Sequence, residues 1–363
     1  MRLKLLSVAT LGLVLASMAG CGGGSSSGGG GGIVGTAYVT LPNGNAVGVY
    51  RVDGSGKLSR VFASPFATGT SPGGIVVHPS NRFVYTANRG SNDISLLTPD
   101  DRTGVLTEVM PRTPSDASPS LMLMNKAGSL LFVANVSGKS ISVYSVNSST
   151  GALQPVGNSP FPTISAPGAI TLSPSEGFLF VANINIASVS VFSVASDGSL
   201  QLVPGPAAAV GRGPAGLVME PSGHFLYVAN SQDNNISIMA FDSSSGTLSV
   251  STGSPTIAGT GPGPLALSPS GATLYAANFG NGNYSAFTID PGTGVLTPVT
   301  NSPFPACTTP TFIVVNPTVR ALFAGCQTGK TINHSAIKTD GSLVSAADDA
   351  STGSAPAFMA FTH

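Results

Sequence analysis

The chain contains no tryptophan and few charged residues. Of its 363 residues, 15 are Lys or Arg and 15 are Asp or Glu, which gives 8% charged residues and a formal net charge of +0. A nucleic-acid-binding protein needs a basic surface, and this composition provides none. Its four histidines form no H-x-x-x-H motif or His–carboxylate cluster. The sequence therefore predicts neither a metal site nor a cofactor.

Helical periodicity is also missing, because no segment after residue 32 carries a sustained 3.6-residue apolar pattern. The apolar run at residues 5–16 follows Arg2 and Lys4 and is too short to span a bilayer. It predicts a signal peptide over residues 1–20. The segment SMAGC then places small residues before Cys21 and resembles a bacterial lipobox, in which the Cys is lipidated. An ordinary secretory signal with an incidental Cys is the alternative.

Residues 22–32 contain only Gly and Ser, a composition typical of a flexible tether. With a lipid on Cys21, residues 21–32 would hold residues 33–363 close to a membrane. We therefore expect an exported protein anchored in the bacterial cell envelope, at the outer membrane or in the periplasm if the cell has two membranes. Its expected partners are that membrane and an envelope protein, peptide or glycan.

Glycine and proline are abundant, at 46 and 28 residues, and they recur in phase. Two markers repeat about every 48 residues, which indicates seven units between residues 33 and 363. The first marker is the Asn that ends an apolar segment: Asn88, Asn135, Asn183, Asn230 and Asn278, with Cys326 and Leu41 at the outer steps. The second is a proline: Pro72, Pro119, Pro167, Pro214, Pro262, Pro310 and Pro356.

Each unit reads as four short strands joined by turns. In the fifth unit they cover residues 216–219, 224–230 and 236–242, with a weaker strand near residues 248–253. Seven helix-free units of this kind predict an all-β, seven-bladed propeller with four antiparallel strands per blade. A β-solenoid is the alternative, but a solenoid needs no closure. Here the chain starts at the second strand of unit 1 and ends after the first strand of the last unit, so the two ends can complete one blade. The C-terminal strand is therefore expected to close the first blade.

Two recurring polar residues are assigned to turns rather than to chemistry. Asn230, at the end of its strand, is expected to hydrogen-bond local backbone at the corner. The aspartates recur at equivalent turns, where they are expected to accept hydrogen bonds from nearby backbone; they are Asp100, Asp197, Asp242, Asp290 and Asp340.

The apolar segments FVYTAN, LFVAN, LYVAN and LYAAN, each followed by a loop and an ISVY- or ISIM-type strand, resemble the YVTN-type propeller repeat. The SPSG…LYVAN…ISIMAFD…GTL pattern, over all seven units, is similar to the lactonase family of seven-bladed propellers. That family includes 6-phosphogluconolactonase-like and muconate-cycloisomerase-like proteins. The resemblance implies Arg and His directly after the repeated Pro, at the mouth of a central channel. Here the pairs are GG, SL, GA, AG, GP, TF and AF, none of which is ionisable.

Because no general base or anion-binding group follows the prolines, the sequence favours a non-catalytic binding or scaffold module, with no catalytic residues. The alternative is a lactonase-like hydrolase with a divergent site. Candidate binding residues are the charged side chains of the loops on the expected functional face, although simple solvation is an equal alternative; they are Arg89, Asp93, Lys139, Arg212, Asp233 and Lys330. Cys307 and Cys326 are expected at the same end of one blade and predict a disulfide, with two free thiols as the alternative.

Overall fold

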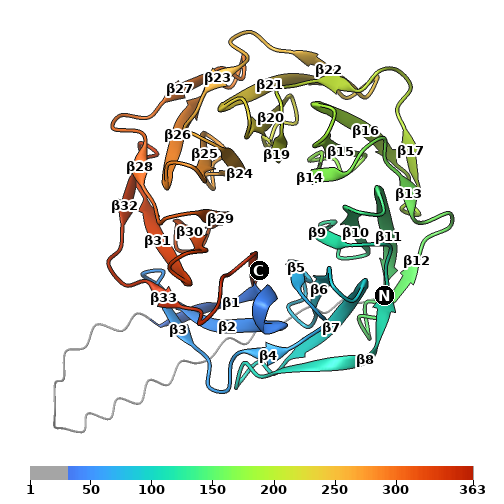
Figure 1. Cartoon of the computed structure of the whole chain (residues 1–363), viewed down its shortest axis with the longest axis vertical. Coiled ribbons are helices and arrows are strands. Elements are labelled where there is room, and N and C mark those ends of the chain that lie inside the picture. Colours follow the sequence, from blue (N-terminus) through green and yellow to red (C-terminus); the bar gives the residue numbers. More distant parts are fainter. Residues whose placement is uncertain (1–31, 363) are drawn as a thin grey trace, which may run out of the picture. The chain divides into compact units, whose positions relative to one another are not determined.

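A computed structural model describes residues 32–362 of the chain. The predicted signal peptide, the lipidation of Cys21 and most of the Gly/Ser tether lie outside these residues. Within them, no helix is long and apolar enough to cross a membrane. The predicted propeller is confirmed: seven antiparallel sheets stand around one axis (Figure 1).

In each blade the strands run from A, nearest the axis, to D at the rim. Blade 1 contains β1 (Ile33–Leu41), β2 (Ala46–Asp53), β3 (Leu58–Arg60), β4 (Phe66–Ala67) and the C-terminal β34 (Met359–Phe361). Blade 2 contains β5 (Pro72–Val77), β6 (Val84–Asn88), β7 (Asp93–Pro99) and β8 (Leu106–Pro114). Blade 3 contains β9 (Pro119–Met124), β10 (Leu130–Asn135), β11 (Ser140–Val146), β12 (Leu153–Pro155) and β13 (Phe161–Pro162). Blade 4 contains β14 (Pro167–Leu172), β15 (Phe178–Asn183), β16 (Ser188–Val194), β17 (Leu200–Leu202) and β18 (Ala208–Ala209).

The remaining blades repeat this order. Blade 5 contains β19 (Pro214–Met219), β20 (Phe225–Asn230), β21 (Asn235–Asp242), β22 (Thr247–Val250) and β23 (Thr256–Ile257). Blade 6 contains β24 (Pro262–Leu267), β25 (Thr273–Asn278), β26 (Asn283–Ile289), β27 (Leu296–Pro298) and β28 (Phe304–Pro305). Blade 7 contains β29 (Pro310–Asn316), β30 (Ala321–Cys326), β31 (Thr331–Ile337), β32 (Leu343–Ser345) and β33 (Ala350–Ser351). A single 3-10 turn, η1 (Pro42–Gly44), follows β1.

Strand D is divided into two short pieces in every blade except blade 2. In blade 3, β12 pairs with the end of β11 and β13 with its beginning. Between the pieces, the hydroxyl of Ser159 accepts a 2.9 Å hydrogen bond from the amide of Val143 in strand C. Ser64, Ser254 and Ser302 do the same in blades 1, 5 and 6. A side chain therefore satisfies the strand-C amide at the point where the backbone ladder is interrupted.

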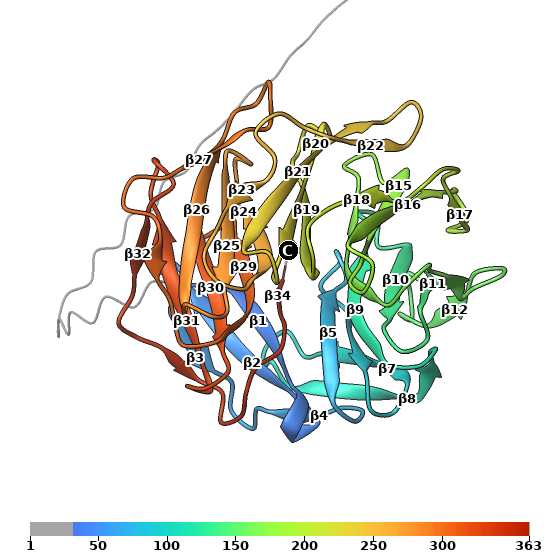
Figure 2. The ribbon, with the colours of Figure 1, turned by 45° about the horizontal axis from the view of Figure 1, so that its top comes forward.

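The ring closes as the sequence predicts, because β34 is the innermost strand of blade 1. Its residues pair antiparallel with β1, from Ala37 opposite Phe361 to Val39 opposite Met359 (Figure 2). Every blade thereby has its innermost strand.

The core lies between neighbouring blades rather than within one. Strand B is fully buried in blades 2, 3, 5, 6 and 7, and its residues pack against strands B and C of the next blade. Buried tyrosines add a polar link: the hydroxyl of Tyr85 donates to Gly151 O of blade 3 at 2.7 Å, and Tyr227 and Tyr275 repeat this bond. Burial raises the pKa of Tyr275 to about 12, so the hydroxyl stays a donor at physiological pH.

The two sequence markers are cross-strand partners. Pro214 pairs with Asn230 in blade 5, and the same Pro–Asn pairing starts strand A in blades 2, 3, 4 and 6. The hydrogen-bond partner predicted for Asn230, local backbone, is wrong. Its amide nitrogen donates to side chains of strand C, Asn235 Oδ1 at 2.7 Å and Ser237 Oγ at 2.8 Å, rather than to local backbone. The Asn side chain turns into the blade, where it is fully buried. It therefore links strand B to strand C by hydrogen bonds.

Loops of two kinds lie at opposite ends of the strands. The B–C corners and D–A loops form one end, here called the upper face; the A–B turns and C–D hairpins form the other, the lower face. The turn role of the aspartates is confirmed on the lower face, where Asp242 Oδ1 accepts from the amide and hydroxyl of Ser244 at 2.9 and 2.7 Å. These hydrogen bonds, led by the Ser244 hydroxyl, lower the pKa of Asp242 to about 2.

Candidate functional site at the upper mouth of the channel

A central cavity of about 510 Å³ runs along the propeller axis. All seven innermost strands line it, mostly through the residues that follow the repeated Pro. The lining residues are Gly, Ala, Pro and larger apolar residues, with one polar side chain, Thr311, whose hydroxyl donates to Pro356 O at 2.8 Å. Among the described residues, no ionisable side chain lines this cavity. A space of about 530 Å³ that shares Ile75, Met122, Val314 and Met359 continues it to the lower face.

The upper mouth of the channel is set by one repeated backbone contact. In blades 2 to 7 the residue after the marker Asn or Cys donates its amide to the residue before the repeated Pro, as Arg89 does to Ser71 O at 3.1 Å. This bond holds the six residues close to the start of strand A; they are Arg89, Val136, Ile184, Ser231, Phe279 and Gln327. The mouth therefore combines three apolar residues, two neutral polar residues and one cation.

Arg89 is the candidate binding residue that the structure places at this mouth. Its side chain lies across Gly73, directly after Pro72: a Cβ on Gly73 would be 3.3 Å from Arg89 Cδ. Glycine at 73 thus leaves room for the arginine. The Arg89 side chain is exposed and has no hydrogen-bond or ion-pair partner among residues 32–362. Blade 4 repeats this arrangement with an apolar residue, because Ile184 Cβ lies 3.2 Å from the Cβ position of Gly168.

Three of the other predicted binding residues have partners within the fold. Asp93 accepts a 2.6 Å hydrogen bond from Asn88 Nδ2, and the Arg112 guanidinium lies 3.9 Å from it. Arg212 and Asp233 form an ion pair at 2.7 Å, and Asp233 also accepts from the Arg212 amide at 2.7 Å. Those two bonds, the backbone one first, hold the pKa of Asp233 below its usual value. The pair joins the D–A loop before blade 5 to the B–C corner of that blade.

Lys139 and Lys330 take equivalent backbone positions at the ends of their B–C corners. Both have left-handed φ, 49° and 53°, a conformation that Asn or Gly adopts at this place in blades 1, 2, 5 and 6. Their carbonyls accept a hydrogen bond from the D–A side, from Thr163 N at 2.8 Å and Thr352 N at 2.9 Å. Their backbones therefore shape the turn, and their exposed side chains point the charge into solvent. The six predicted residues do not form one cluster.

Cys307 and Cys326 form a disulfide with a Cα–Cα distance of 5.6 Å. Cys326 ends β30 and Cys307 lies in the D–A loop before Pro310, so the bond fastens this loop to strand B on the upper face. Among the described residues, no group of three or more His, Cys, Asp or Glu side chains could hold a metal ion.

Charge on the loops does not identify the mouth residues Ile184, Phe279 and Gln327, because none of them is ionisable. The signal that identifies them is position, one residue after the marker at the end of strand B. The side chains of Phe279 and Ile184 are exposed, by 48% and 37%.

A family model described as Lactonase, 7-bladed beta-propeller matches residues 35–164, 158–256 and 249–361. The chain belongs to this lactonase family. No curated relative matches the sequence.

Solved structures similar to this lactonase-family chain cover it almost completely. A candidate 6-phosphogluconolactonase from Bacteroides uniformis has a TM-score of 0.79 at 21% identity, covering 90% of this chain and 99% of its own. One from Bacteroides fragilis has a TM-score of 0.76 at 22% identity, covering 94% and 100%. The periplasmic gluconolactonase of Pseudomonas aeruginosa has a TM-score of 0.75 at 20% identity, covering 91% and 99%. At these identities the likeness establishes the fold.

Proposed function

We propose that this lactonase-family protein binds a small, weakly polar lactone at the upper mouth of its channel and hydrolyses it slowly. The observation that carries the proposal is Arg89, a cation without a partner in the described chain, placed over Gly73 at an otherwise uncharged opening. A guanidinium can bond the carbonyl oxygen of an ester, while apolar walls accept the rest of the ring.

The same geometry suggests which lactones are favoured. A phosphorylated, polyhydroxylated sugar lactone needs several cations and hydrogen-bonding groups, whereas the mouth residues supply one arginine and one glutamine among Val, Ile, Ser and Phe. We therefore expect unphosphorylated lactones with apolar substituents to bind better than 6-phosphogluconolactone.

Arg89 would assist hydrolysis by stabilising negative charge on the carbonyl oxygen as hydroxide attacks the carbonyl carbon. Removal of one such donor typically lowers the rate by about 10²–10³-fold in well-developed sites. The residues of the mouth include no His, Asp or Glu to take a proton from water, and a positioned base is typically worth about 10²–10⁴-fold. The proposed reaction is therefore slow and depends on hydroxide, so its rate should rise with pH.

The test is hydrolysis of δ-valerolactone, dihydrocoumarin and 6-phosphogluconolactone by the purified full chain, followed by acid release. Arg89→Gln is compared with Arg102→Gln, which removes an exposed cation from the lower face of the same blade. We expect turnover of the first two substrates, loss of it in Arg89→Gln, and none of that loss in Arg102→Gln. Turnover that survives Arg89→Gln, or a preference for the phosphorylated lactone, would contradict the proposal.

We also propose that the propeller is anchored in the envelope by a lipid on Cys21, on the support of the SMAGC segment and the Gly/Ser sequence that follows. Mass spectrometry of the N-terminal peptide tests this, with Cys21→Ser as the control. An unmodified Cys21 in protein extracted from membranes would contradict it. The expected envelope partner, a protein, peptide or glycan, stays a prediction.

A further inference from the structure

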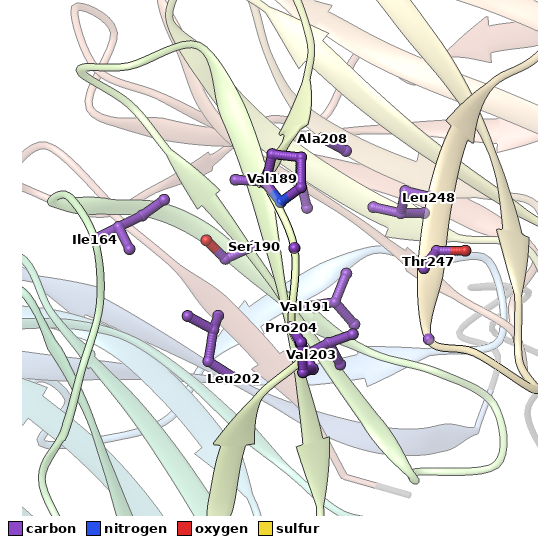
Figure 3. A pocket seen from close by; sticks show the side chains of 14 residues that line it. Ile164, Val189, Ser190, Val191, Leu202, Val203, Pro204, Ala208, Thr247 and Leu248 are labelled. Atoms are coloured by element: carbon purple, nitrogen blue, oxygen red, sulfur yellow. The ribbon is translucent and has the colours of Figure 1, made fainter.

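A second pocket lies at the rim, between blades 4 and 5 and apart from the channel. It has a volume of about 270 Å³ and is lined on the strand-C side by Val189 and Val191, on the D side by Val203 and Ala208, and on the blade 5 side by Leu248 (Figure 3). Nothing in the proposed lactone chemistry uses this pocket. Its origin can be traced by comparing blade 4 with its sister blades.

Three sister blades place a phenylalanine at the position of Ala208. Phe66, Phe161 and Phe304 are each the first residue of the second piece of strand D and pair with strand C opposite Val47, Ile141 and Tyr284. Ala208 pairs with Val189 in the same register. The rings of Phe161 and Phe304 are 8% exposed and belong to the core between their blade and the next. Blade 4 therefore lacks a phenyl ring where the repeat otherwise supplies one.

Blade 7 shows that an alanine alone does not make the pocket. Ala350 is equivalent to Ala208, but Tyr50 of the neighbouring blade packs into the same core cluster, and its hydroxyl donates to Ser351 O at 3.0 Å. The equivalent residue beside blade 4 is Met239, which is unbranched, is buried in one cluster with Val189 and Val191, and does not line the pocket. The space next to Ala208 stays open.

Blade 4 also lacks the serine that caps the amide of strand C. The amides of Val49, Val143, Ile238 and Ala286 each donate to a serine hydroxyl at 2.8–2.9 Å. In blade 4 that serine is replaced by Pro206, and the equivalent amide belongs to Val191, a lining residue of the pocket. Val191 O accepts from Val203 N at 2.8 Å, but its amide has no acceptor among the described residues. The pocket thus combines an apolar space with one uncapped donor.

We propose that this pocket binds a small single-ring aromatic compound that carries a hydroxyl or carbonyl oxygen. The ring takes the place that the Phe161 ring takes in blade 3, and the oxygen accepts from the Val191 amide as Ser159 Oγ accepts from Val143. Apolar cavities of protein cores bind benzene-sized molecules, and the volume here accommodates one ring with a short substituent. A buried amide that lacks an acceptor favours a ligand that supplies one.

Binding of phenol and of its isostere toluene to the full chain tests the proposal by calorimetry or ligand-observed NMR. Ala208→Phe refills the ring position and should abolish binding of both while raising the Tm. Thr256→Phe is the matched control, because it adds a ring at the equivalent position of blade 5 and should leave binding unchanged. Pro206→Ser tests the donor: it should weaken phenol about fivefold, the equivalent of one net hydrogen bond, without changing toluene.

The triple variant Pro206→Ser, Ala207→Pro, Ala208→Phe gives residues 206–208 of blade 4 the Ser-Pro-Phe sequence of residues 159–161 in blade 3. It shows whether a loss of binding in the single variants comes from local strain. It should fold, unfold at a higher temperature than the parent, and bind neither probe. Absence of phenol binding to the parent at millimolar concentration would overturn the proposal. Phenol binding that persists in the triple variant, or an equal response of phenol and toluene to Pro206→Ser, would overturn it as well.

Discussion

Blades 2 to 6 and blade 7 hold the same corner together by different chemistry. In blades 2, 5 and 6 the residue three before the repeated Pro is a glycine packed on the marker Asn: a Cβ on Gly211 would be 2.7 Å from Asn230 Cγ, and Gly69 and Gly259 are as close to their Asn. In blade 7 these two positions are Cys307 and Cys326. The glycine leaves room for the amide, and in blade 7, where the amide is absent, both positions are cysteine. Blades 3 and 4 keep the Asn with Asp116 and Ile164 in the glycine position.

The two solutions differ in what they join. The Asn amide links strand B to strand C through hydrogen bonds to side chains, for example Asn278 Nδ2 to Asn283 Oδ1 at 2.7 Å and Ser285 Oγ at 2.9 Å. The disulfide links strand B to the D–A loop instead. A substitution can remove one hydrogen bond of an Asn and leave the other, whereas loss of either cysteine removes the whole disulfide. The free energy of unfolding should therefore respond differently to substitutions in the two kinds of blade.

Loss of the disulfide is expected to have the largest effect. The double variant Cys307→Ala, Cys326→Ala should lower the free energy of unfolding by about 3 kcal/mol, as expected for a disulfide that closes a loop of this length. Denaturant unfolding of the full chain measures it, and the parent under reducing conditions should behave in the same way. A loss below about 1 kcal/mol would show that the bond does not hold the corner.

Loss of one marker amide should have a somewhat smaller effect. Asn230→Ala removes two buried hydrogen bonds and should lower the free energy of unfolding by about 2 kcal/mol. Gln232→Ala, an exposed residue in the same corner, is the control and should change stability little. Equal stability of the two variants would contradict the role given to the Asn.

Replacing the disulfide of blade 7 by a Gly–Asn pair tests whether the two kinds of link are interchangeable. Cys307→Gly with Cys326→Asn gives blade 7 the Gly–Asn pair of blade 5, and Asn333 of strand C is available as a partner at the position of Ser237. This variant should be about 1–2 kcal/mol more stable than the double alanine variant in the same denaturant series. If the free energy of unfolding does not rise above that of the double alanine variant, the Asn link depends on residues other than the two exchanged.

Blades with an unpaired Asn oxygen offer a gain in stability. Asn183, Asn230 and Asn278 each bury a side-chain oxygen without a hydrogen-bond partner among the described residues, whereas Ser115 Oγ donates to Asn135 Oδ1 at 3.1 Å. The equivalent of Ser115 in blade 6 is Ala258. Ala258→Ser should therefore raise the free energy of unfolding by about 1 kcal/mol. In an Asn278→Ala background the gain should vanish, which a double-mutant cycle would measure.

Acid should act on the lower face rather than on the neutral Asn corners. Burial alone would raise the pKa of Glu220, but hydrogen bonds from Ser222, His224 and Phe225 lower it below 4.5. A lowered pKa in the folded state stabilises the protein above the unfolded pKa, and that stability is lost as pH falls through the folded pKa. Unfolding free energy should therefore decline below about pH 4.5, less steeply in Glu220→Gln. An identical decline in that variant would contradict this role.

The repeat made the fold predictable from sequence, because the spacing of Pro and Asn reports a geometry that every blade shares. The two markers pair across strands A and B, so neither can shift without the other. The partner of Asn230 is part of the same repeat, because a serine follows each of the five marker Asn residues after seven positions and accepts from its amide. Spacing alone does not show that the Asn side chain turns toward this serine rather than toward local backbone.

The candidate site was harder to predict because charge was a poor guide. Arg212 and Asp233 are both on the upper face, but they neutralise each other across two loops that only the fold brings together. Arg89 differs from them in lying one residue after a marker, and that position could have been chosen from the repeat. The rim pocket depends on residues that are missing, Phe at 208 and Ser at 206, and it becomes visible when blades are compared with one another.

The pairing of β34 with β1 has a consequence for how the protein is made. Thr36 and Thr362 are hydrogen-bonded although 326 positions separate them in the sequence, so blade 1 cannot be completed until the last residues have been synthesised. Six blades can assemble in order along the chain, while the first waits with an unpaired inner edge. A nascent propeller of this design is therefore exposed to strand exchange with other chains until its final three-residue strand arrives.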